Sequence, residues 1–287
     1  MATSSPSAIL LISCPDCSGI VARMSAFVRD NKGNIVHLDQ HVDTEESVFF
    51  MRMEWSLEDF AISRKDLPGA LEKFTASFAM SWSLHFSEER PRVALLVSKE
   101  SHCLYDLLSR HESGELRMEI PLIIGNHEHL RPAAERFNIP FHHLPITKAT
   151  KAEQEGKEFS LLDEHGVDTI VLARYMQILS EDFVARYPNR IINIHHSFLP
   201  AFPGARPYHS AYRRGVKIIG ATSHYVTPEL DEGPIIAQDV TSVSHKDSIT
   251  DFLRHGKDLE KIVLARALWS HVEHKVLVYE NKTVVFD

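Results

Sequence analysis

The stretch Ile191-Ile192-Asn193-Ile194-His195-His196-Ser197-Phe198-Leu199-Pro200 decides the fold of the second half of the chain. Its apolar, β-branched start gives way abruptly to amide, imidazole and hydroxyl groups, and Pro200 then breaks the pattern. A buried strand of a parallel sheet has this composition where it delivers polar side chains to the carboxyl edge of the sheet. We therefore predict a strand that ends at a functional site.

Asn193 and His195 are the two polar groups that this strand would present together. They lie two residues apart, so on an extended strand their side chains point to the same side. The amide of Asn193 can donate a hydrogen bond to an oxyanion, and the imidazole of His195 can move protons near neutral pH. A solvated histidine at a strand end is the plain alternative, and the pair alone does not decide between the two.

A carboxylate, Asp231, follows in the turn Thr227-Pro228-Glu229-Leu230-Asp231-Glu232-Gly233-Pro234, between predicted strands at 218–226 and 235–240. From this turn Asp231 can reach an imidazole on a neighbouring strand. The alternative is an aspartate that bonds the backbone of its own turn, which is common for Asp close to Gly.

Composition restricts the class of protein. The 287 residues are enough for two domains, and 44% apolar residues are typical of globular domains. The net charge of −8 argues against a nucleic-acid-binding surface, and no apolar run approaches the ~20 residues that cross a bilayer. Residues 1–7 do not resemble a signal peptide, and three cysteines form a sparse, odd set. We expect a cytoplasmic protein, without membrane association, that starts with a disordered leader at 1–7.

Residues 8–88 predict a small ferredoxin-like domain, because strands and helices follow each other in the order βαββαβ. The strands are expected at 8–14, 35–43, 47–55 and 82–87, and the helices at 18–31 and 67–81. Cys14-Pro15-Asp16-Cys17 opens the first helix, but no second cysteine pair accompanies it, so a redox or zinc site is not favoured.

The turn Cys14-Pro-Asp-Cys-Ser-Gly-Ile-Val21 resembles the opening turn of ACT domains. This resemblance implies a regulatory domain that binds an amino-acid effector and pairs with other copies. We accordingly expect a homo-oligomer, most simply a homotetramer built as a dimer of dimers. A dimerisation lobe without a ligand is nearly as well supported.

Residues 89–287 predict a doubly wound α/β domain with a mostly parallel sheet, because strands alternate with helices. Strands are expected at 93–98, 119–125, 141–144, 169–173, 190–194, 218–226 and 235–240. Helices are expected at 102–112, 127–137, 151–165, 180–187, 207–214 and 248–273, before a terminal hairpin at 276–279 and 284–286.

The motifs of this second domain resemble the folate-dependent formyltransferase and formyl-hydrolase superfamily. Its hallmark is Asn-x-His at a strand end with Ser-x-Leu-Pro behind it, and Asp-x-Gly some thirty-five residues later. Both parts stand here, as Asn193-Ile-His195-His-Ser-Phe-Leu-Pro200 and Asp231-Glu-Gly233. The resemblance covers roughly residues 90–287 and implies a Rossmann-type formyltransferase fold. The separate small domain in front makes the folate hydrolases of the superfamily the nearest resemblance.

The resemblance also implies a reaction and its residues. The expected reaction is hydrolysis of 10-formyltetrahydrofolate to formate and tetrahydrofolate, which would balance one-carbon folates for purine synthesis. Folate is the substrate, water the acceptor, and no cofactor is expected. Asn193 would bind the formyl oxygen, His195 would transfer protons and Asp231 would orient the histidine. The folate pocket is expected at Leu172, Met176, Gln177, Ile178, Leu179, Thr227, Pro228 and Glu229.

Two departures from the glycinamide ribonucleotide formyltransferases favour water as the acceptor. Where those enzymes carry a glycine-rich loop that cradles a phosphate, this chain reads Val97-Ser-Lys-Glu-Ser-His-Cys103, and Gln177 replaces an arginine. Formyl transfer to an unphosphorylated amine is the alternative reaction. A non-catalytic folate or amino-acid sensor is a second alternative, against which the complete Asn193, His195 and Asp231 set argues.

Eighteen histidines raise the question of a metal site. The pairs His142-His143 and His195-His196 and the run His127-Glu-His129 lack the His-Glu-x-x-His spacing of zinc hydrolases. Adjacent histidines on a strand point to opposite faces, so each pair is expected to offer one ligand at most. We therefore expect no metal. Ser197 lacks a Gly-x-Ser-x-Gly elbow, and we expect its hydroxyl to shape the loop rather than act as a nucleophile.

Overall fold

A computed structural model describes residues 5–76, 79–201 and 207–287, and the chain divides into two units. The first unit comprises Met1–Glu89, Glu273–Tyr279 and Val284–Asp287. The second comprises Arg90–Val272 and Glu280–Thr283. Of the leader expected at 1–7, residues 1–4 lie outside the described residues, and Ser7 already belongs to the first strand.

The first unit is built on a four-stranded antiparallel sheet in the order β2-β3-β1-β4. The strands are β1 (Ser7–Pro15), β2 (Asn34–Asp43), β3 (Val48–Ser56) and β4 (Ser81–Phe86), and the helices are α1 (Ile20–Asp30) and α2 (Leu67–Thr75). This is the predicted βαββαβ arrangement. Gly33 follows α1 because a Cβ there would lie 2.6 Å from a methyl group of Val28. The helix predicted over 67–81 ends at Thr75, and residues 77–78 lie outside the described residues.

Strand alternation gives this sheet two apolar faces. On one face Leu10, Met53 and Trp55 pack in the core that includes α1 and α2. On the other face Leu11 and Phe50 form a second cluster. The C-terminal residues Leu277, Tyr279, Val284 and Phe286 complete this cluster.

An arginine fixes the backbone that leads into the C-terminal hairpin. The buried guanidinium of Arg52 on β3 donates to the carbonyl oxygens of His274 at 3.0 Å and Glu273 at 3.4 Å. The sequence had placed all of 89–287 in the second domain, whereas the structure gathers these C-terminal residues with the first unit. A short hairpin carries no signal for which surface it covers, because any exposed apolar face can receive it.

The second unit contains a seven-stranded sheet in the order β11-β10-β9-β8-β5-β6-β7. Its strands are β5 (Val93–Val97), β6 (Ile123–Gly125), β7 (Phe141–His143), β8 (Thr169–Ala173), β9 (Ile191–His195), β10 (Ile218–Tyr225) and β11 (Ile235–Ser242). In this order, all neighbouring strands between β9 and β7 run parallel, whereas β10 runs antiparallel to both β9 and β11. The mostly parallel α/β sheet predicted from the alternation is thus confirmed.

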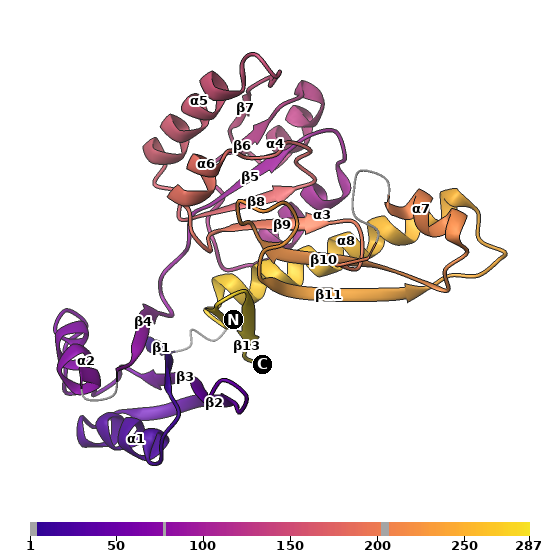
Figure 1. Cartoon of the computed structure of the whole chain (residues 1–287). Coiled ribbons are helices and arrows are strands. Elements are labelled where there is room, and N and C mark those ends of the chain that lie inside the picture. The colour runs from indigo at the N-terminus through magenta and orange to yellow at the C-terminus, as the bar shows by residue number, and fades with distance from the viewer. Residues whose placement is uncertain (1–4, 77–78, 202–206) are drawn as a thin grey trace. The chain divides into compact units, whose positions relative to one another are not determined.

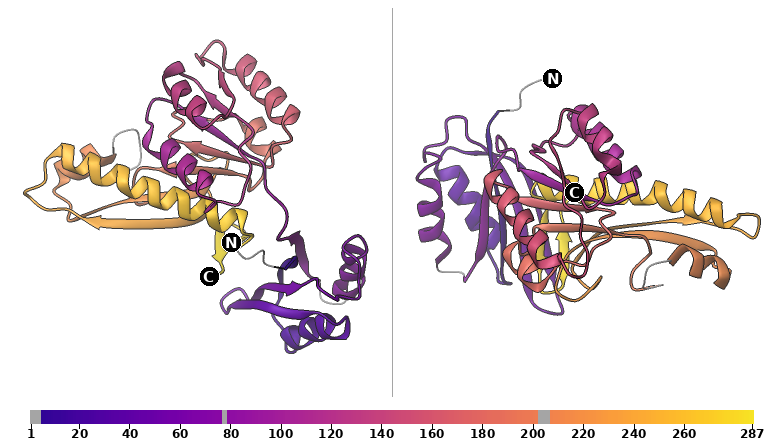
Figure 2. Two further views of the ribbon diagram at one scale, coloured as in Figure 1. Left: turned by 180° about the vertical axis from the view of Figure 1, so that it is seen from behind. Right: turned by 90° about the horizontal axis from the view of Figure 1, so that it is seen from above.

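Helices lie on both sides of this sheet (Figures 1 and 2). They are α3 (His102–Glu112), α4 (Arg131–Arg136), α5 (Lys151–Glu164), α6 (Glu181–Arg186), α7 (Pro207–Arg214) and α8 (Ile249–Val272). Leu162 of α5 and Phe183 of α6 pack in a core with Leu96 and Leu172 of the sheet. The long helix α8 runs along β9, β10 and β11 and packs on α3. No described helix is both long and apolar enough to cross a membrane.

One predicted strand is shorter than expected. The pattern predicted a strand over 119–125, but only Ile123–Gly125 pairs continuously, with a single bridge from Glu119 to Arg92. Pro121 interrupts the ladder because it has no N–H to donate. The apolar residues Ile120 and Leu122 on either side of Pro121 therefore made the strand look longer than it is.

Candidate active site

The carboxyl end of β9 presents the polar groups of the central motif. Asn193 and His195 are the last two residues of the strand that alternate to one side, and His195 is buried. Beside β9 runs the antiparallel strand β10, in which His224 is the direct cross-strand neighbour of Asn193. The register thus brings an amide and two imidazoles to one edge of the sheet.

Asp231 reaches this edge from the turn after β10. Its Oδ1 lies 3.2 Å from Nδ1 of His195 and 3.7 Å from Nε2 of His224. Asp231 has a left-handed backbone conformation, with φ of 60°. Gly233 lets the turn fold onto β10, because a Cβ there would lie 1.8 Å from the carbonyl oxygen of Tyr225. The Asp-x-Gly spacing therefore has a steric reason.

The ring of His224 links Asn193 to the turn. Its Nδ1 lies 2.8 Å from the carbonyl oxygen of Tyr225, which can only accept, so Nδ1 carries the proton. In the neutral ring Nε2 is then an acceptor, and the Asn193 amide donates to it at 3.2 Å. This bond orients the amide and leaves its second N–H for another acceptor. The tautomer is inferred from these partners.

Asp231 is held as a carboxylate. Partial burial acts to raise the pKa of Asp231, but the hydrogen bond from His195 and the nearby imidazoles outweigh burial and hold the pKa well below its usual range. An ionised Asp231 accepts from Nδ1 of His195, so the other nitrogen, Nε2, is the one free to exchange protons. This Nε2 is buried and has no hydrogen-bond partner among the described residues.

A cavity of about 280 Å³ opens at these groups. Asn193, His195 and Asp231 all line it, as do seven of the eight residues expected to bind folate. These seven are Leu172, Met176, Gln177, Ile178, Leu179, Thr227 and Pro228. Glu229 does not occur in the described lining of the cavity; its carbonyl oxygen instead accepts from the hydroxyl of Thr227.

His196 departs from the expectation for adjacent strand histidines. Both His195 and His196 line the cavity, with ring centroids 5.2 Å apart. The expectation that they point to opposite faces was wrong, because β9 ends at His195 and strand alternation does not extend to the next residue.

The loop after β9 is held by hydroxyl groups. Thr222 on β10 donates to the carbonyl oxygen of Ser197 at 2.9 Å and accepts from the backbone N–H of Leu199 at 3.0 Å. Ser197 itself donates to the carbonyl oxygen of Ala201 at 2.8 Å. The Ser197 hydroxyl therefore shapes the loop.

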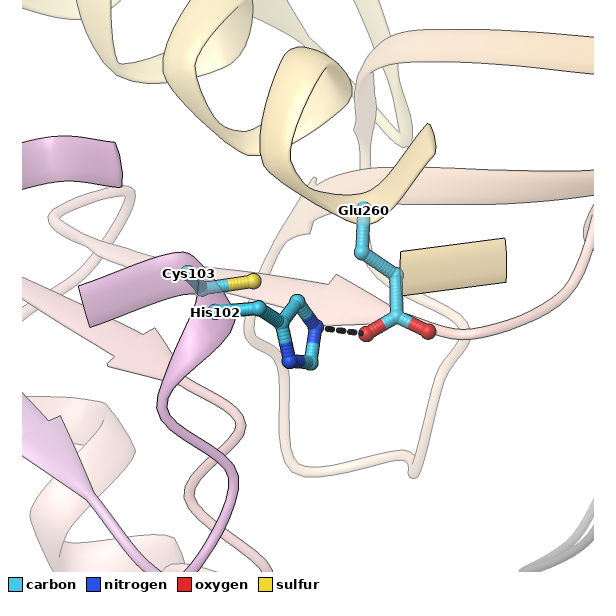
Figure 3. Close-up of side chains that lie close together, drawn as sticks. All are labelled: His102, Cys103 and Glu260. Atoms are coloured by element: carbon cyan, nitrogen blue, oxygen red, sulfur yellow. Dashed lines mark hydrogen bonds and ion pairs between the residues drawn. The ribbon is translucent and has the colours of Figure 1, made fainter. Parts of the chain in front are cut away.

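A cluster of His102, Cys103 and Glu260 deserves a metal test, since its potential ligand atoms lie within 4.8 Å of one another. Figure 3 shows His102 and Cys103 at the start of α3 and Glu260 on α8, with the imidazole bonded to the carboxylate. His102 Nε2 lies 2.7 Å from Glu260, which also accepts from Tyr208 at 3.0 Å and lies 3.3 Å from Arg174.

These contacts do not favour a metal. Burial, reinforced by the charge of Glu260, raises the pKa of Cys103 well above its usual range, so the thiolate that a metal requires is disfavoured. Arg174 would repel a cation. The cluster is therefore better described as a buried ion-pair network.

Comparison with known proteins places the chain in a family. The model of the formyl transferase family matches residues 91–268. The chain belongs to the formyl transferase family. The matched region coincides with the second unit, which carries the cavity.

Named relatives of this formyl transferase family member extend over both units. The formyltetrahydrofolate deformylase of Synechocystis sp. is 56% identical over 97% of this chain and 98% of its own length. The formyltetrahydrofolate deformylase of Bacillus subtilis is 50% identical over 97% of this chain and 93% of its own.

Solved structures separate two groups within the family. The formyltetrahydrofolate deformylase of Pseudomonas syringae pv. tomato superposes with a TM-score of 0.97 at 46% identity, covering 100% of this chain and 96% of that one. Glycinamide ribonucleotide transformylase 1 of Symbiobacterium toebii has a TM-score of 0.66 at 28% identity and covers 98% of that chain but only 71% of this one. The whole length of the present chain is thus matched by a deformylase.

Sequence reasoning missed several residues of the cavity. His224, His196, Arg174 and Tyr175 all line it. His224 had a usable signal, since it comes two residues after Thr222 at the end of an apolar strand that leads into the Asp231 turn. Its link to Asn193 depends on the antiparallel pairing of β9 with β10, which local patterns do not show.

Proposed function

We propose that the chain hydrolyses 10-formyltetrahydrofolate to formate and tetrahydrofolate. The observation that carries this proposal is the buried Nε2 of His195, which has no hydrogen-bond partner in the described part of the chain. Its ring lines the cavity and is held by Asp231 from the other side. The full-length similarity to formyltetrahydrofolate deformylases supports the same substrate.

Asn193 would stabilise the oxyanion. When water adds to the formyl carbon, the carbonyl oxygen becomes negative, and the second amide N–H of Asn193 can donate to it. Because His224 already holds the first N–H, the amide is oriented before the charge develops. One such donor contributes roughly 3–4 kcal/mol in comparable oxyanion sites.

His195 would carry the protons. Its Nε2 accepts a proton from the attacking water as the new C–O bond forms, and Asp231 stabilises the resulting imidazolium. The same nitrogen then gives the proton to N10 of the folate as the C–N bond breaks. The products are formate and tetrahydrofolate, and none of these steps uses a metal or a cofactor.

The folate ring system would bind along the apolar side of the cavity. Met176, Ile178 and Leu230 line the cavity and are 50%, 62% and 62% exposed, so they offer apolar surface that a ligand would cover. Polar groups for ring edges come from Gln177 and Thr227.

Water is favoured over an amine as the formyl acceptor. The segment 98–103 has no glycine, so its side chains limit how closely a phosphate could approach the backbone N–H groups. At the start of α3, Nε2 of His102 is engaged with Glu260. The segment therefore lacks the open backbone cradle that a phosphate needs.

The acid in this segment, Glu100, repels a phosphate less than its place in the sequence predicts. Its carboxylate pairs with Lys257 at 2.6 Å, so its charge is largely compensated. The argument therefore depends on the absence of glycine rather than on repulsion.

The first unit would serve as an ACT-like regulatory domain in a cytoplasmic homo-oligomer. The order β2-β3-β1-β4 leaves β2 and β4 as edge strands to which a second copy can pair. An amino acid is the expected effector, and a dimer of dimers the expected assembly. Light scattering at micromolar concentration tests the assembly, and a monomer there contradicts it.

An acceptor-dependence assay tests the reaction. Purified protein with 10-formyltetrahydrofolate should release formate without added amine, and glycinamide ribonucleotide should leave the rate of folate turnover unchanged. If no formate is released and an added amine is recovered in formylated form, the activity is formyl transfer to an amine and not hydrolysis.

A further inference from the structure

A buried carboxyl that the proposed reaction does not use lies behind the cavity. Glu158 on α5 is fully buried, and one of its oxygens accepts from the hydroxyl of Tyr175 at 2.8 Å. Tyr175 lines the cavity, within the segment that follows β8. We name this segment, residues 174–180, the folate wall, because four of the expected folate contacts lie in it.

The folate wall is held at three points. The hydroxyl of Ser98 accepts from the backbone N–H of Met176 at 3.0 Å. Glu158 holds the side chain of Tyr175, and Glu155, one turn earlier on α5, accepts from the backbone N–H of Ser180 at 3.0 Å. Two of the three points are thus buried carboxyls that face the same segment.

These two carboxyls are not equivalent. Glu155 has a cation 3.9 Å away in Lys151 and a backbone N–H as donor. Glu158 has only the Tyr175 hydroxyl, and its second oxygen, Oε2, is buried without a hydrogen-bond partner among the described residues. The side-chain oxygen of Gln154, one turn away on the same helix, is likewise buried without a hydrogen-bond partner among the described residues. A proton on Glu158 would turn Oε2 into a donor, one helical turn from this unused acceptor.

We propose that Glu158 is a positioning residue that keeps the folate wall in its binding conformation only while it carries a proton. The inference rests on the proposed folate site. An ionised Glu158 would place a second negative charge beside Glu155 in a dry environment, and moving the wall outward would let water reach that charge.

The protonation of Glu158 changes in an accessible pH range. Burial raises the pKa of Glu158 to about 7, with a smaller increase from the charge of Glu155 and an opposing effect of the Tyr175 hydrogen bond. These are the titratable groups that act on Glu158, from α5 and from the folate wall. Because the pKa is raised, the stabilising contribution of the protonated form is complete below about pH 4.5 and is lost as pH rises through about 7.

The expected consequence is a KM for 10-formyltetrahydrofolate that rises with pH. Above pH 7 the population of molecules with a displaced folate wall can grow, relative to the binding-competent population, by up to about tenfold per pH unit. The value of kcat should follow this rise much less, because His195 and Asp231 belong to other elements. A purely structural glutamate would change stability without this separation of KM from kcat.

The test compares the pH profile of KM from pH 5.5 to 8.5 in wild type, Glu158→Gln and Glu153→Gln. Glu158→Gln keeps an acceptor for Tyr175 but cannot ionise, so its KM should stay flat and its melting temperature should exceed that of wild type at pH 8 but not at pH 5. Glu153 lies on the same helix but is exposed, so Glu153→Gln should keep the wild-type profile. The inference is overturned if Glu158→Gln keeps the inflection that wild type shows in KM against pH. It is also overturned if Glu153→Gln loses that inflection.

Two further variants move the inflection in opposite directions. Glu155→Gln removes the neighbouring charge and should shift the inflection to lower pH, whereas Tyr175→Phe removes the bond that favours the carboxylate and should shift it to higher pH. Shifts in the same direction, or none, contradict the proposal even if Glu158→Gln does not fold. If wild type releases no formate at all, the proposed function fails instead, and the melting temperatures still report on Glu158 directly.

Discussion

Two of the imidazole–carboxylate pairs in the second unit differ in what surrounds them. His195 and Asp231 lie 3.2 Å apart at the carboxyl end of β9, and His102 and Glu260 lie 2.7 Å apart between α3 and α8. In both pairs burial acts to raise the pKa of the carboxyl, and the histidine and other neighbours lower it further than burial raises it. By the distance between nitrogen and carboxylate oxygen alone, His102 and Glu260 form the tighter pair.

Their remaining partners separate a reactive pair from a structural one. Glu260 also accepts from Tyr208 and faces Arg174, and its side chain is 1% exposed. Within the described residues, the side chain of Asp231 has only histidines as partners; it is 19% exposed and lines the cavity together with His195. Both histidines have a buried nitrogen without a hydrogen-bond partner among the described residues, Nδ1 in His102 and Nε2 in His195. The comparison teaches that such a pair becomes a candidate for catalysis when its ring lines a cavity, not through the strength of its ion pair.

Asp231→Asn should have the largest effect on turnover. The substitution keeps the size of the side chain but removes the charge that stabilises the His195 imidazolium, so kcat should fall on the order of 10³–10⁴-fold. Folate binding, measured by fluorescence titration, should change little because the folate wall is intact. A loss of less than tenfold in kcat would remove Asp231 from the mechanism.

His195→Ala should lower kcat by at least ~10²-fold, the usual contribution of a general acid–base group. His102→Ala is the matched control, since it removes the histidine of the other pair. Steady-state rates per folded protein should stay within about tenfold of wild type for His102→Ala. Equal losses in both variants would abolish the distinction between the two pairs.

Glu260→Gln should mainly reduce stability. It removes the buried carboxylate that faces the partly buried Arg174, and breaking a buried ion pair by removing one partner costs about 3–5 kcal/mol of unfolding free energy. Denaturant titration measures this loss, and turnover at low temperature should remain within tenfold of wild type. An unchanged stability combined with a turnover as low as that of Asp231→Asn would instead place Glu260 in the reaction.

Cys103→Ser should have the smallest effect. If the cluster of His102, Cys103 and Glu260 is an ion-pair network, purified protein should contain no stoichiometric zinc, and the substitution should change neither metal content nor turnover appreciably. One zinc per chain by elemental analysis, lost in Cys103→Ser, would show that the cluster is a metal site.

The sequence predicted what short-range patterns encode. The apolar run of β9, its polar end and the Asp-Glu-Gly turn follow from composition and spacing, and the structure brings Asn193, His195 and Asp231 to one cavity. The alternation of strands and helices likewise predicted both sheets.

What the sequence did not predict depends on long-range pairing. The place of His224 beside Asn193 depends on which strand β10 pairs with, and the packing of the C-terminal hairpin on Leu11 and Phe50 depends on an otherwise open sheet face. His196 was assigned to the wrong side because the end of β9 was not known to within one residue. Glu158 had no local signal, since its burial comes from the packing of α5 against the sheet.

The central claim is that water, activated by His195, attacks the formyl carbon. A turnover in H₂¹⁸O followed by mass spectrometry of the formate tests it most directly. The account predicts formate that contains one ¹⁸O atom, in equal amount to the tetrahydrofolate formed and without any added amine. Formate without ¹⁸O, or consumption of the substrate only when an amine is present and becomes formylated, would contradict it.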